Sequence, residues 1–290
     1  MKSFLLTFLS FASLSIAKLE PTCENKDANC TSPADRVAAE TAVDYHYYNP
    51  DLHANNIIEV TLDKEVLKEI RAGYDKDIHP HYESAKSTDD FCLVAPYSQK
   101  TMTFQFIKEV RSDIRWYSVR NKETYDRYLE LVKKLGLIET IKDRKWVDED
   151  DEPIIYSMFF IPRSFSNKHE FHDDWPEEIG TQITTFLIPM SDDFNIGLAY
   201  LDNDMNPQSL QYTYGKGYGV GGGLRHSTDT GKSETQDVLL CVYVGSSKKK
   251  KVWKWAKKYI ADELEHYMNP FKGFVLNDNF KREGVTSKCQ

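Results

Sequence analysis

The chain lacks several patterns that define common protein classes. It contains only five cysteines and no Cys-x-x-Cys segment, which excludes zinc-ribbon and thioredoxin-like proteins. It has no Gly-x-Ser-x-Gly segment, the tight turn that presents the nucleophile of an α/β-hydrolase. Basic residues are not in excess: 37 Lys and Arg against 45 Asp and Glu give a formal net charge of −8, which argues against a general nucleic-acid binder.

Long apolar runs are absent beyond the first 17 residues, so the sequence predicts no transmembrane segment. The apolar stretch from Phe4 to Ile16 is too short to span a bilayer comfortably, and Ser15-Ile16-Ala17 places small residues where signal peptidase requires them. Residues 1–17 are therefore predicted to be a signal peptide. Cleavage leaves 290 − 17 = 273 residues in the secretory pathway, either secreted or in the endoplasmic reticulum lumen.

The cysteines suit an oxidising compartment. Two pairings are plausible: Cys23 with Cys30, which closes a small loop, and Cys92 with Cys289. Cys241 lies within an apolar strand-like run and is predicted to be a free core thiol. Asn29 begins an N-glycosylation sequon, and the sequence leaves its use open.

Length and composition favour one large domain over residues 18–290. With 40% hydrophobic and 13% aromatic residues, the mature chain can bury a substantial core, and it shows no internal repeat. Residues 50–150 are predicted to hold supporting helices and strands, including a helix over Asp63–Ala72 that stops at Gly73 and another over Asn121–Leu135. A further helix is predicted over about residues 248–268, with lysines on its solvent-exposed face.

Residues of about 154–245 contain short strand-like runs separated by turn formers. The runs are rich in β-branched, aromatic and other apolar side chains. They are Thr181–Ile188, Gly197–Leu201, Leu210–Tyr214 and Val238–Val244. This part of the chain is therefore predicted to be mainly β.

His172, Asp174 and the distant His226 are the most informative residues. Side chains on an extended segment alternate between faces, so His172 and Asp174 project to the same side. Two imidazoles and one carboxylate can hold a non-heme Fe(II) ion on one face and leave positions open for other ligands. His169 also lies nearby, but its odd offset from His172 turns it to the other face.

The order and spacing of these residues, with strands between them, resemble the Fe(II)/2-oxoglutarate-dependent dioxygenases, which include prolyl hydroxylases. The resemblance covers about a third of the chain. It implies a mainly β (α+β) fold with a double-stranded β-helix core, jelly-roll or cupin-like, buttressed by helices. It also implies that His172, Asp174 and His226 are catalytic iron ligands. The implied cofactors are Fe(II), 2-oxoglutarate and O2 as co-substrates, and ascorbate as a candidate reductant.

The chain departs from that family at the co-substrate anchor. The family places an Arg or Lys about eight to eleven residues after the distal His, where it pairs with the far carboxylate of 2-oxoglutarate. The corresponding positions here are Glu234, Thr235, Gln236 and Asp237, none of which is basic. Candidate replacements, in order, are Lys232, Arg225 and Arg163, with Gln236 as a supporting hydrogen-bond donor.

Four aromatic residues are candidates for lining the pocket: Tyr156, Trp175, Tyr200 and Tyr214. The substrate is a small molecule or a peptidyl group, and the sequence does not identify it or the oligomeric state. Two alternatives stay open because the anchor is missing. One is a cupin-like metalloenzyme that does not use 2-oxoglutarate, and the other is a non-catalytic binding module on a degenerate barrel.

The signal peptide and cysteine assignments are tested on secreted material. Its N-terminus should lie at or near Lys18, and it should contain at least one disulfide, which we expect to join Cys23 and Cys30. Intact-mass measurement with and without reductant checks both points. A retained Met1 segment, or five free thiols, would contradict the predicted compartment.

Overall fold

Seven strands form a large antiparallel sheet in the order β1-β8-β5-β10-β4-β3-β2. In this computed structural model, residues 57–84, 86–94, 112–144, 150–175, 183–202, 206–221 and 224–247 are described. The strands of the large sheet are β1 (Ile58–Thr61), β2 (Phe91–Val94), β3 (Trp116–Val119), β4 (Ile154–Ser166), β5 (Ile183–Pro189), β8 (Lys216–Gly221) and β10 (Gly231–Gly245).

A smaller antiparallel sheet has the order β7-β6-β9. Its strands are β6 (Leu198–Leu201), β7 (Pro207–Leu210) and β9 (His226–Thr228). A bridge between His172 and His226 adds the segment around His172 beside β9. From β4 onwards the chain passes back and forth between the two sheets, which is the winding of a double-stranded β-helix. The predicted fold class, mainly β with this core and supporting helices, is confirmed.

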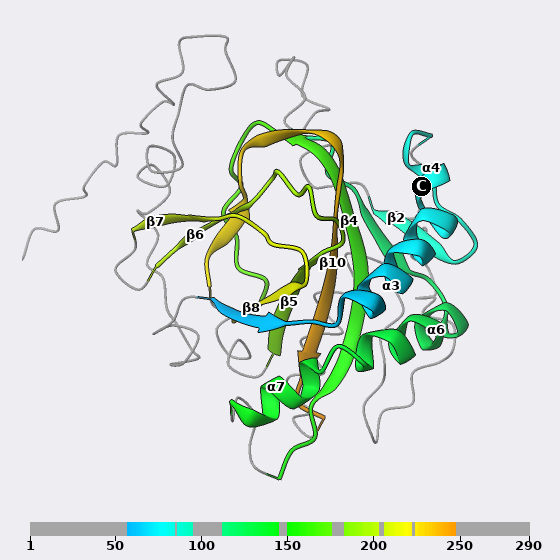
Figure 1. Cartoon of the computed structure of the whole chain (residues 1–290), viewed down its shortest axis with the longest axis vertical. Helices are drawn as coiled ribbons and strands as arrows, with labels where there is room; N and C mark the ends of the chain where they lie inside the picture. Colours follow the sequence, from blue (N-terminus) through cyan, green and yellow to red (C-terminus); the bar gives the residue numbers. More distant parts are fainter. Residues whose placement is uncertain are drawn as a thin grey trace, which may run out of the picture.

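The two faces of β10 bury different cores. Val238, Leu240, Val242 and Val244 pack in the cluster that includes the helices, whereas Leu239, Cys241 and Tyr243 pack in the cluster between the sheets. A strand that is buried on both faces reads as a continuous apolar run, which explains the Val238–Val244 sequence. Figure 1 shows α3 and α6 on the opposite side of β10 and β4 from β6 and β7.

Helix α3 (Lys64–Asp77) begins at Asp63, whose side chain accepts a hydrogen bond from the Glu65 amide at 2.8 Å. The predicted end at Gly73 is wrong, because the helix continues to Asp77. A Cβ at Gly73 would lie 2.6 Å from the Tyr128 hydroxyl oxygen. This glycine therefore permits close contact with the next long helix rather than ending its own.

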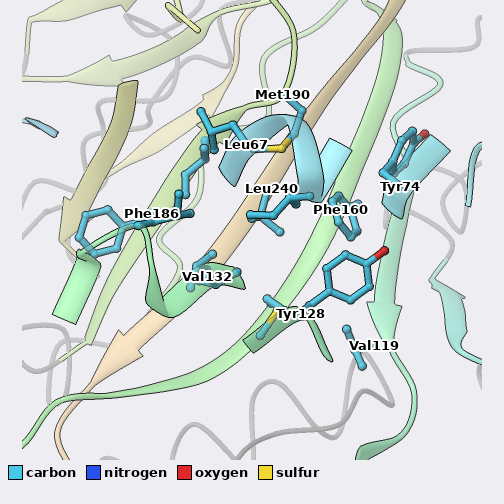
Figure 2. Close-up of a cluster of buried hydrophobic side chains, with 14 of the residues drawn as sticks. Leu67, Tyr74, Val119, Tyr128, Val132, Phe160, Phe186, Met190 and Leu240 are labelled. Atoms are coloured by element: carbon cyan, nitrogen blue, oxygen red, sulfur yellow. The ribbon is translucent and has the colours of Figure 1, made fainter. Parts of the chain in front are cut away.

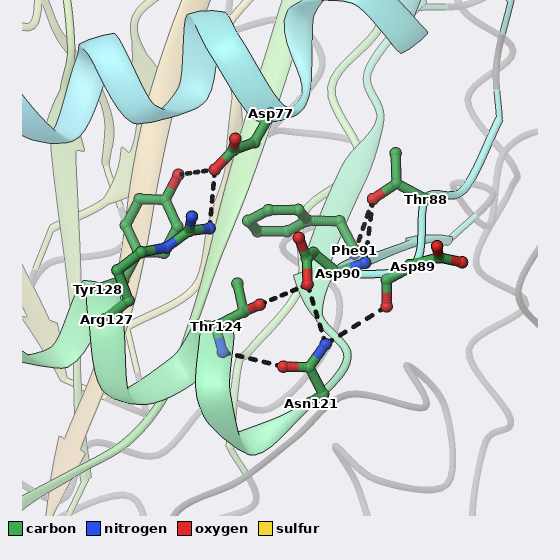
Figure 3. Close-up of polar contacts among 9 residues, drawn as sticks. All are labelled: Asp77, Thr88, Asp89, Asp90, Phe91, Asn121, Thr124, Arg127 and Tyr128. Carbon is green, nitrogen blue, oxygen red and sulfur yellow. Dashed lines mark hydrogen bonds and ion pairs between the residues drawn. The ribbon is translucent and has the colours of Figure 1, made fainter.

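Helix α6 (Lys122–Lys133) confirms the second predicted helix, and its N-terminus is fixed by the contacts in Figure 3. The Asn121 side chain accepts from the Thr124 amide at 2.9 Å and donates to Asp90 at 3.1 Å. Thr124 donates its hydroxyl to the same carboxylate at 2.7 Å. These hydrogen bonds lower the pKa of Asp90 and fasten the helix to the start of β2. Two short helices, α4 (His79–Tyr82) and α7 (Leu137–Asp143), complete the helical part.

The core between the helices and the large sheet is largely aromatic and aliphatic (Figure 2). Phe160 of β4 lies at its centre, with ring centroids 5.3 Å from Tyr74 and 5.5 Å from Tyr128. Tilted and edge-on ring pairs of this kind stabilise a core beyond simple area burial. This layer holds the outer face of the sheet, so the inner face is free to form the site.

Several predicted boundaries differ from the structure. Strand β7 covers Pro207–Leu210 rather than Leu210–Tyr214, and β10 starts at Gly231, well before Val238. The signal peptide, the helix over 248–268, Asn29, Cys23, Cys30 and Cys289 lie outside the described residues. The single domain over 18–290 stays a prediction. Among the described helices, none is long and apolar enough to cross a membrane.

Two cysteines lie within the described part of the chain. Cys241 is buried and free, as predicted. Cys92 is buried and disulfide-bonded, and its pairing with Cys289 remains a prediction.

Gly219 of β8 is tightly enclosed, which gives a test of the sheet packing. A Cβ there would lie 2.8 Å from Ile58 Cγ1 and 3.0 Å from the Phe186 ring. Gly219→Ala should lower the free energy of unfolding by about 1–3 kcal/mol, the usual cost of overpacking a core. Chemical denaturation measures it. Gly231→Ala is the matched control, because its nearest neighbour lies at 3.5 Å and the change should be neutral or slightly stabilising.

Candidate metal centre

The centre forms where the segment around His172 pairs with β9. The His172 amide donates to the His226 carbonyl at 2.9 Å, and the His226 amide donates to the His172 carbonyl at 3.0 Å. Directly paired residues on antiparallel strands share a face. Both imidazoles therefore point to the same side, although 54 residues separate them in the sequence.

Asp174 completes a compact triad with the two histidines. Its Oδ1 atom lies 3.7 Å from His172 Nε2 and 3.7 Å from His226 Nε2. One candidate ligand atom from each of the three residues lies within 4.8 Å of the others. The sequence prediction that these residues come together is confirmed by this geometry.

In both imidazole rings the hydrogen bonds leave the Nε2 atom available to bind a metal. His172 Nδ1 lies 2.8 Å from the Glu170 carbonyl, and His226 Nδ1 lies 2.8 Å from the Leu224 carbonyl. A carbonyl oxygen only accepts, so each Nδ1 carries the proton and each Nε2 keeps its lone pair. Metal-bound histidines are oriented in this way by a hydrogen bond from the other ring nitrogen.

The Asp174 carboxylate also fits a metal ion. Its Oδ2 is buried and has no hydrogen-bond partner within the described part of the chain. Burying a carboxylate oxygen without a partner is costly, and a bound cation removes that cost. The donor set of two neutral imidazoles and one carboxylate suits Fe(II).

The site opens toward solvent on one side. About half of the His172 side chain is exposed, 53%, against 6% for His226. Desolvation of the His172 ring and the nearby His226 lower the pKa of His172, while Asp174 opposes that effect. The neutral imidazole is the form that binds a metal.

Two of the predicted anchor residues lie away from the triad. Lys232 is exposed near the start of β10. Gln236 accepts a hydrogen bond from Tyr74 of α3 and lies 3.3 Å from the His79 ring, so it faces the helices. The structure does not bring either of them to the metal centre.

Arg163 lies inside the barrel, on β4 opposite Asp237 of β10. It is 1% exposed, and its Nη2 donates to the Ile196 carbonyl at 2.8 Å. Its guanidinium lies 5.1 Å from the centre of the Phe194 ring. Burial lowers the pKa of Arg163, while Tyr212 and Asp237 oppose the shift. Its Nε has no hydrogen-bond partner among the described residues.

Asp237, which the sequence shows only as a non-basic residue at the expected anchor position, is buried in this interior. Its Oδ2 accepts from the Asn195 and Ile196 amides at 2.9 and 2.7 Å. Its Oδ1 is buried without a partner in the described part of the chain. Alternation along the strand indicates that Asp237 faces inward. Leu239 and Cys241 face the interior, so Asp237 faces it too, whereas Gln236 points to the other side.

The predicted pocket aromatics divide into two pairs. Tyr200 lies opposite His226 on β6, and the buried Trp175, which follows Asp174, packs edge-on against Tyr243 at 4.9 Å. Tyr156 instead donates its hydroxyl to the Ser246 carbonyl, and Tyr214 donates to the Lys64 carbonyl beside α3. Trp175 and Tyr200 therefore border the triad, whereas the other two have structural contacts elsewhere.

The remaining predicted residues lie close to the triad without joining it. Arg225 precedes His226 and is partly buried, and its carbonyl accepts from the Leu201 amide at 3.1 Å. His169 lies on the opposite face of its segment from His172, as the odd offset predicts, and contacts Asp229. It is not a member of the triad.

No family model matches the chain, and no curated protein matches it in sequence. Among solved structures it is similar to AviO1 from Streptomyces viridochromogenes Tue57, with 9% identity, a TM-score of 0.48, and coverage of 65% of this chain and 89% of that one. A prolyl-4-hydroxylase from Pseudomonas putida shows 10% identity and a TM-score of 0.44 over 74% and 98% of the chains. HygX from Streptomyces hygroscopicus, with nickel and 2-oxoglutarate bound, shows 10% and 0.43 over 69% and 87%.

These values are too low to transfer an activity or a residue's role to this chain. What the chain itself shows is a double-stranded β-helix in which His172, Asp174 and His226 lie together and could hold a metal ion.

Replacing any one ligand should empty the metal site without unfolding the protein. His172→Ala, Asp174→Ala and His226→Ala should each reduce bound iron from about one per chain to a small fraction, because two ligands remain. Metal analysis after anaerobic loading measures this. Asp174→Ala should not destabilise the metal-free protein, since it removes a buried carboxylate oxygen that has no partner among the residues the structure describes. His81→Ala on α4 is the control, and equal iron loss there would refute the assignment.

Proposed function

We propose that this protein is an Fe(II)- and 2-oxoglutarate-dependent dioxygenase that hydroxylates an unactivated C–H bond. The observation that carries the proposal is the convergence of two Nε2 lone pairs on the Asp174 carboxylate, whose buried Oδ2 has no hydrogen-bond partner among the described residues. When bound, iron, 2-oxoglutarate and O2 supply the oxidation. The chain supplies ligation, orientation and exclusion of water.

The surroundings of the triad support these roles. Trp175 is 2% exposed and is held by packing on Tyr243 and by a 3.4 Å hydrogen bond to Thr185. It directly follows Asp174 in the sequence and packs in the cluster between the sheets. The partly exposed His172 leaves the other side open. A small molecule or a peptidyl side chain can reach the metal from that side, and this defines the substrate class we propose.

Arg163 is the best candidate for the residue that anchors the far carboxylate of 2-oxoglutarate. It is the cation that the structure places on the interior face of β4, opposite Asp237. Asp237, Leu239 and Cys241 follow one another along the interior face of β10. Cys241 lies close enough to Asp174 for the carboxylate to influence its thiol. A single interior surface therefore links Arg163 to the triad, and a buried cation there would offset the cost of burying a carboxylate.

A second candidate function follows from Asp237. Its negative charge already acts on Arg163, and it lies where the family has its anchoring cation. Because the Asp237 carboxylate partly offsets the positive charge of Arg163, the guanidinium attracts a second carboxylate less strongly. This observation favours a metal-dependent enzyme of the same fold that does not use 2-oxoglutarate.

The proposal includes a location and a reductant that the sequence suggests. The predicted signal peptide over residues 1–17 places the enzyme in the secretory pathway. Ascorbate is the reductant to supply in assays, because it keeps iron in the ferrous state. Both are parts of the proposal to be tested with the activity.

Anaerobic reconstitution tests the function directly. Adding Fe(II) and then 2-oxoglutarate to the full mature chain should produce the visible charge-transfer absorption of the chelate, and admitting O2 should yield succinate. Absorption spectra and succinate analysis make the measurement. Iron binding without the absorption band or succinate would reject the co-substrate and leave the second candidate. Failure to bind any metal would reject both.

The anchor is tested by replacing Arg163 with Gln, which keeps hydrogen-bonding capacity and removes the charge. Its apparent Kd for 2-oxoglutarate should rise at least tenfold, about 1.4 kcal/mol, while iron stays bound. Titration of the visible absorption in anaerobic protein measures the affinity. Arg163→Lys should keep part of it. Lys232→Gln and Arg225→Gln are the matched controls, and a larger loss in either one would move the anchor there.

A further inference from the structure

Few backbone hydrogen bonds join the two segments that carry the ligands. The pairing of His172 with His226 is an isolated bridge and not part of a longer ladder. Two residues before His172, the Glu170 amide donates to the Ser227 hydroxyl at 2.7 Å, and the ladder does not continue through a carbonyl. The relative position of the ligands therefore depends on side chains.

His169 and Asp229 supply the missing cross-link. His169 lies three residues before His172, and Asp229 lies three residues after His226, so they are directly opposite in the antiparallel register. His169 Nε2 lies 2.9 Å from Asp229 Oδ1, with 1% and 12% of the two side chains exposed. The contact is almost fully shielded from solvent.

Asp229 connects this pair to the rest of the small sheet. Its carboxylate accepts from the Ser209 hydroxyl of β7 and from the Thr230 amide at 2.7 Å. Its own amide donates to the Gly197 carbonyl at 3.0 Å. Although burial opposes the change, hydrogen bonds from His169 and Ser209 lower the pKa of Asp229. Asp229 therefore contacts the His172 segment through His169, β7 through Ser209, and the residue just before β6 through the Gly197 carbonyl.

The pair lies on the opposite face of the small sheet from the metal ligands. His169 stacks on Phe171 with ring centroids 5.5 Å apart, and Phe171 packs with Ala199 and Leu201. Neighbouring residues alternate between faces, so this cluster cannot enter the site. Any effect of the pair on the metal must act through the backbone.

We propose that His169 and Asp229 are positioning residues that fix the register of the two ligand-bearing segments and thereby set the affinity and geometry of the metal centre. The inference rests on the metal site of the proposed function, and not on the use of 2-oxoglutarate. A one-residue slip between paired strands would turn a ligand to the wrong face. Residues that support metal ligands from behind typically change metal affinity by about 10–100-fold when replaced.

The test is a Co(II) titration of the full mature chain. Asp229→Ala should raise the Kd for Co(II) at least tenfold and change the visible Co(II) spectrum, because the three ligands no longer meet in one geometry. Asp229→Asn should restore most of the affinity and the native spectrum. An asparagine can still accept from His169 and the Thr230 amide, and its amide can donate to Ser209. His169→Ala should resemble Asp229→Ala.

Asp113 offers a matched control. It also accepts several hydrogen bonds, from the Ser164 and Phe165 amides at 2.8 and 3.0 Å and from the Tyr82 hydroxyl at 2.8 Å, but it joins β4 to the chain before β3. Asp113→Ala should lower Tm about as much as Asp229→Ala. Its Co(II) affinity and spectrum should remain native, which separates positioning from general stability.

Two outcomes overturn the inference. One is a native Co(II) Kd and spectrum in Asp229→Ala. The other is an equal loss of affinity in Asp113→Ala. Hydrogen exchange of the His172 and His226 amides in metal-free protein gives a second readout, and it should accelerate in Asp229→Ala but not in Asp113→Ala. Native protein that binds Co(II) but produces no succinate would reject the proposed co-substrate, while the comparison of variants still decides the positioning role.

Discussion

The centre depends on one short antiparallel contact, the pairing of His172 with His226. Two backbone hydrogen bonds of 2.9 and 3.0 Å bring their side chains to one face, and Asp174 follows on the same face two residues after His172. This contact is short because the chain must leave the small sheet for the large one on either side of it. The side chains around it therefore carry more of the positioning than they would in a long ladder.

The barrel can form such a site because helices cover the outer face of the large sheet, while the small sheet carries His226. The large sheet is held from outside by α3 and α6, whose aromatic side chains pack on Phe160, and so its inner face is available for polar groups. The charged residues of the interior differ in whether an opposite charge lies beside them. Asp174 has a buried oxygen, without a partner in the described part of the chain, that a metal would satisfy, while Arg163 already has Asp237 opposite it. The first arrangement favours a metal, and the second weakens the attraction for an anionic co-substrate.

Sequence periodicity predicted the parts of the fold in which burial follows a repeating pattern. The helix from Asn121 and the apolar run of Val238–Val244 were found because one packs by a stripe and the other is buried on both faces. Gly73 was misread as a helix stop, since only the packed neighbour Tyr128 shows why a glycine lies there. Helix α7 and the early start of β10 have no comparable repeat.

For the site, the sequence by itself determined that His172 and Asp174 share a face, because an H-x-D spacing on an extended segment fixes which side chains point the same way. The order and spacing of the residues pointed to His226, and its pairing with His172 brings it to that face. It ranked Lys232 ahead of Arg225 and Arg163 and named Gln236 rather than Asp237. The interior instead holds Arg163 and Asp237, because strand register decides which neighbour faces inward. The same limit hid the pair of His169 and Asp229. Residues that are 60 positions apart become partners only when the His172 segment pairs beside β9 in the small sheet, and the tertiary structure alone determines that contact.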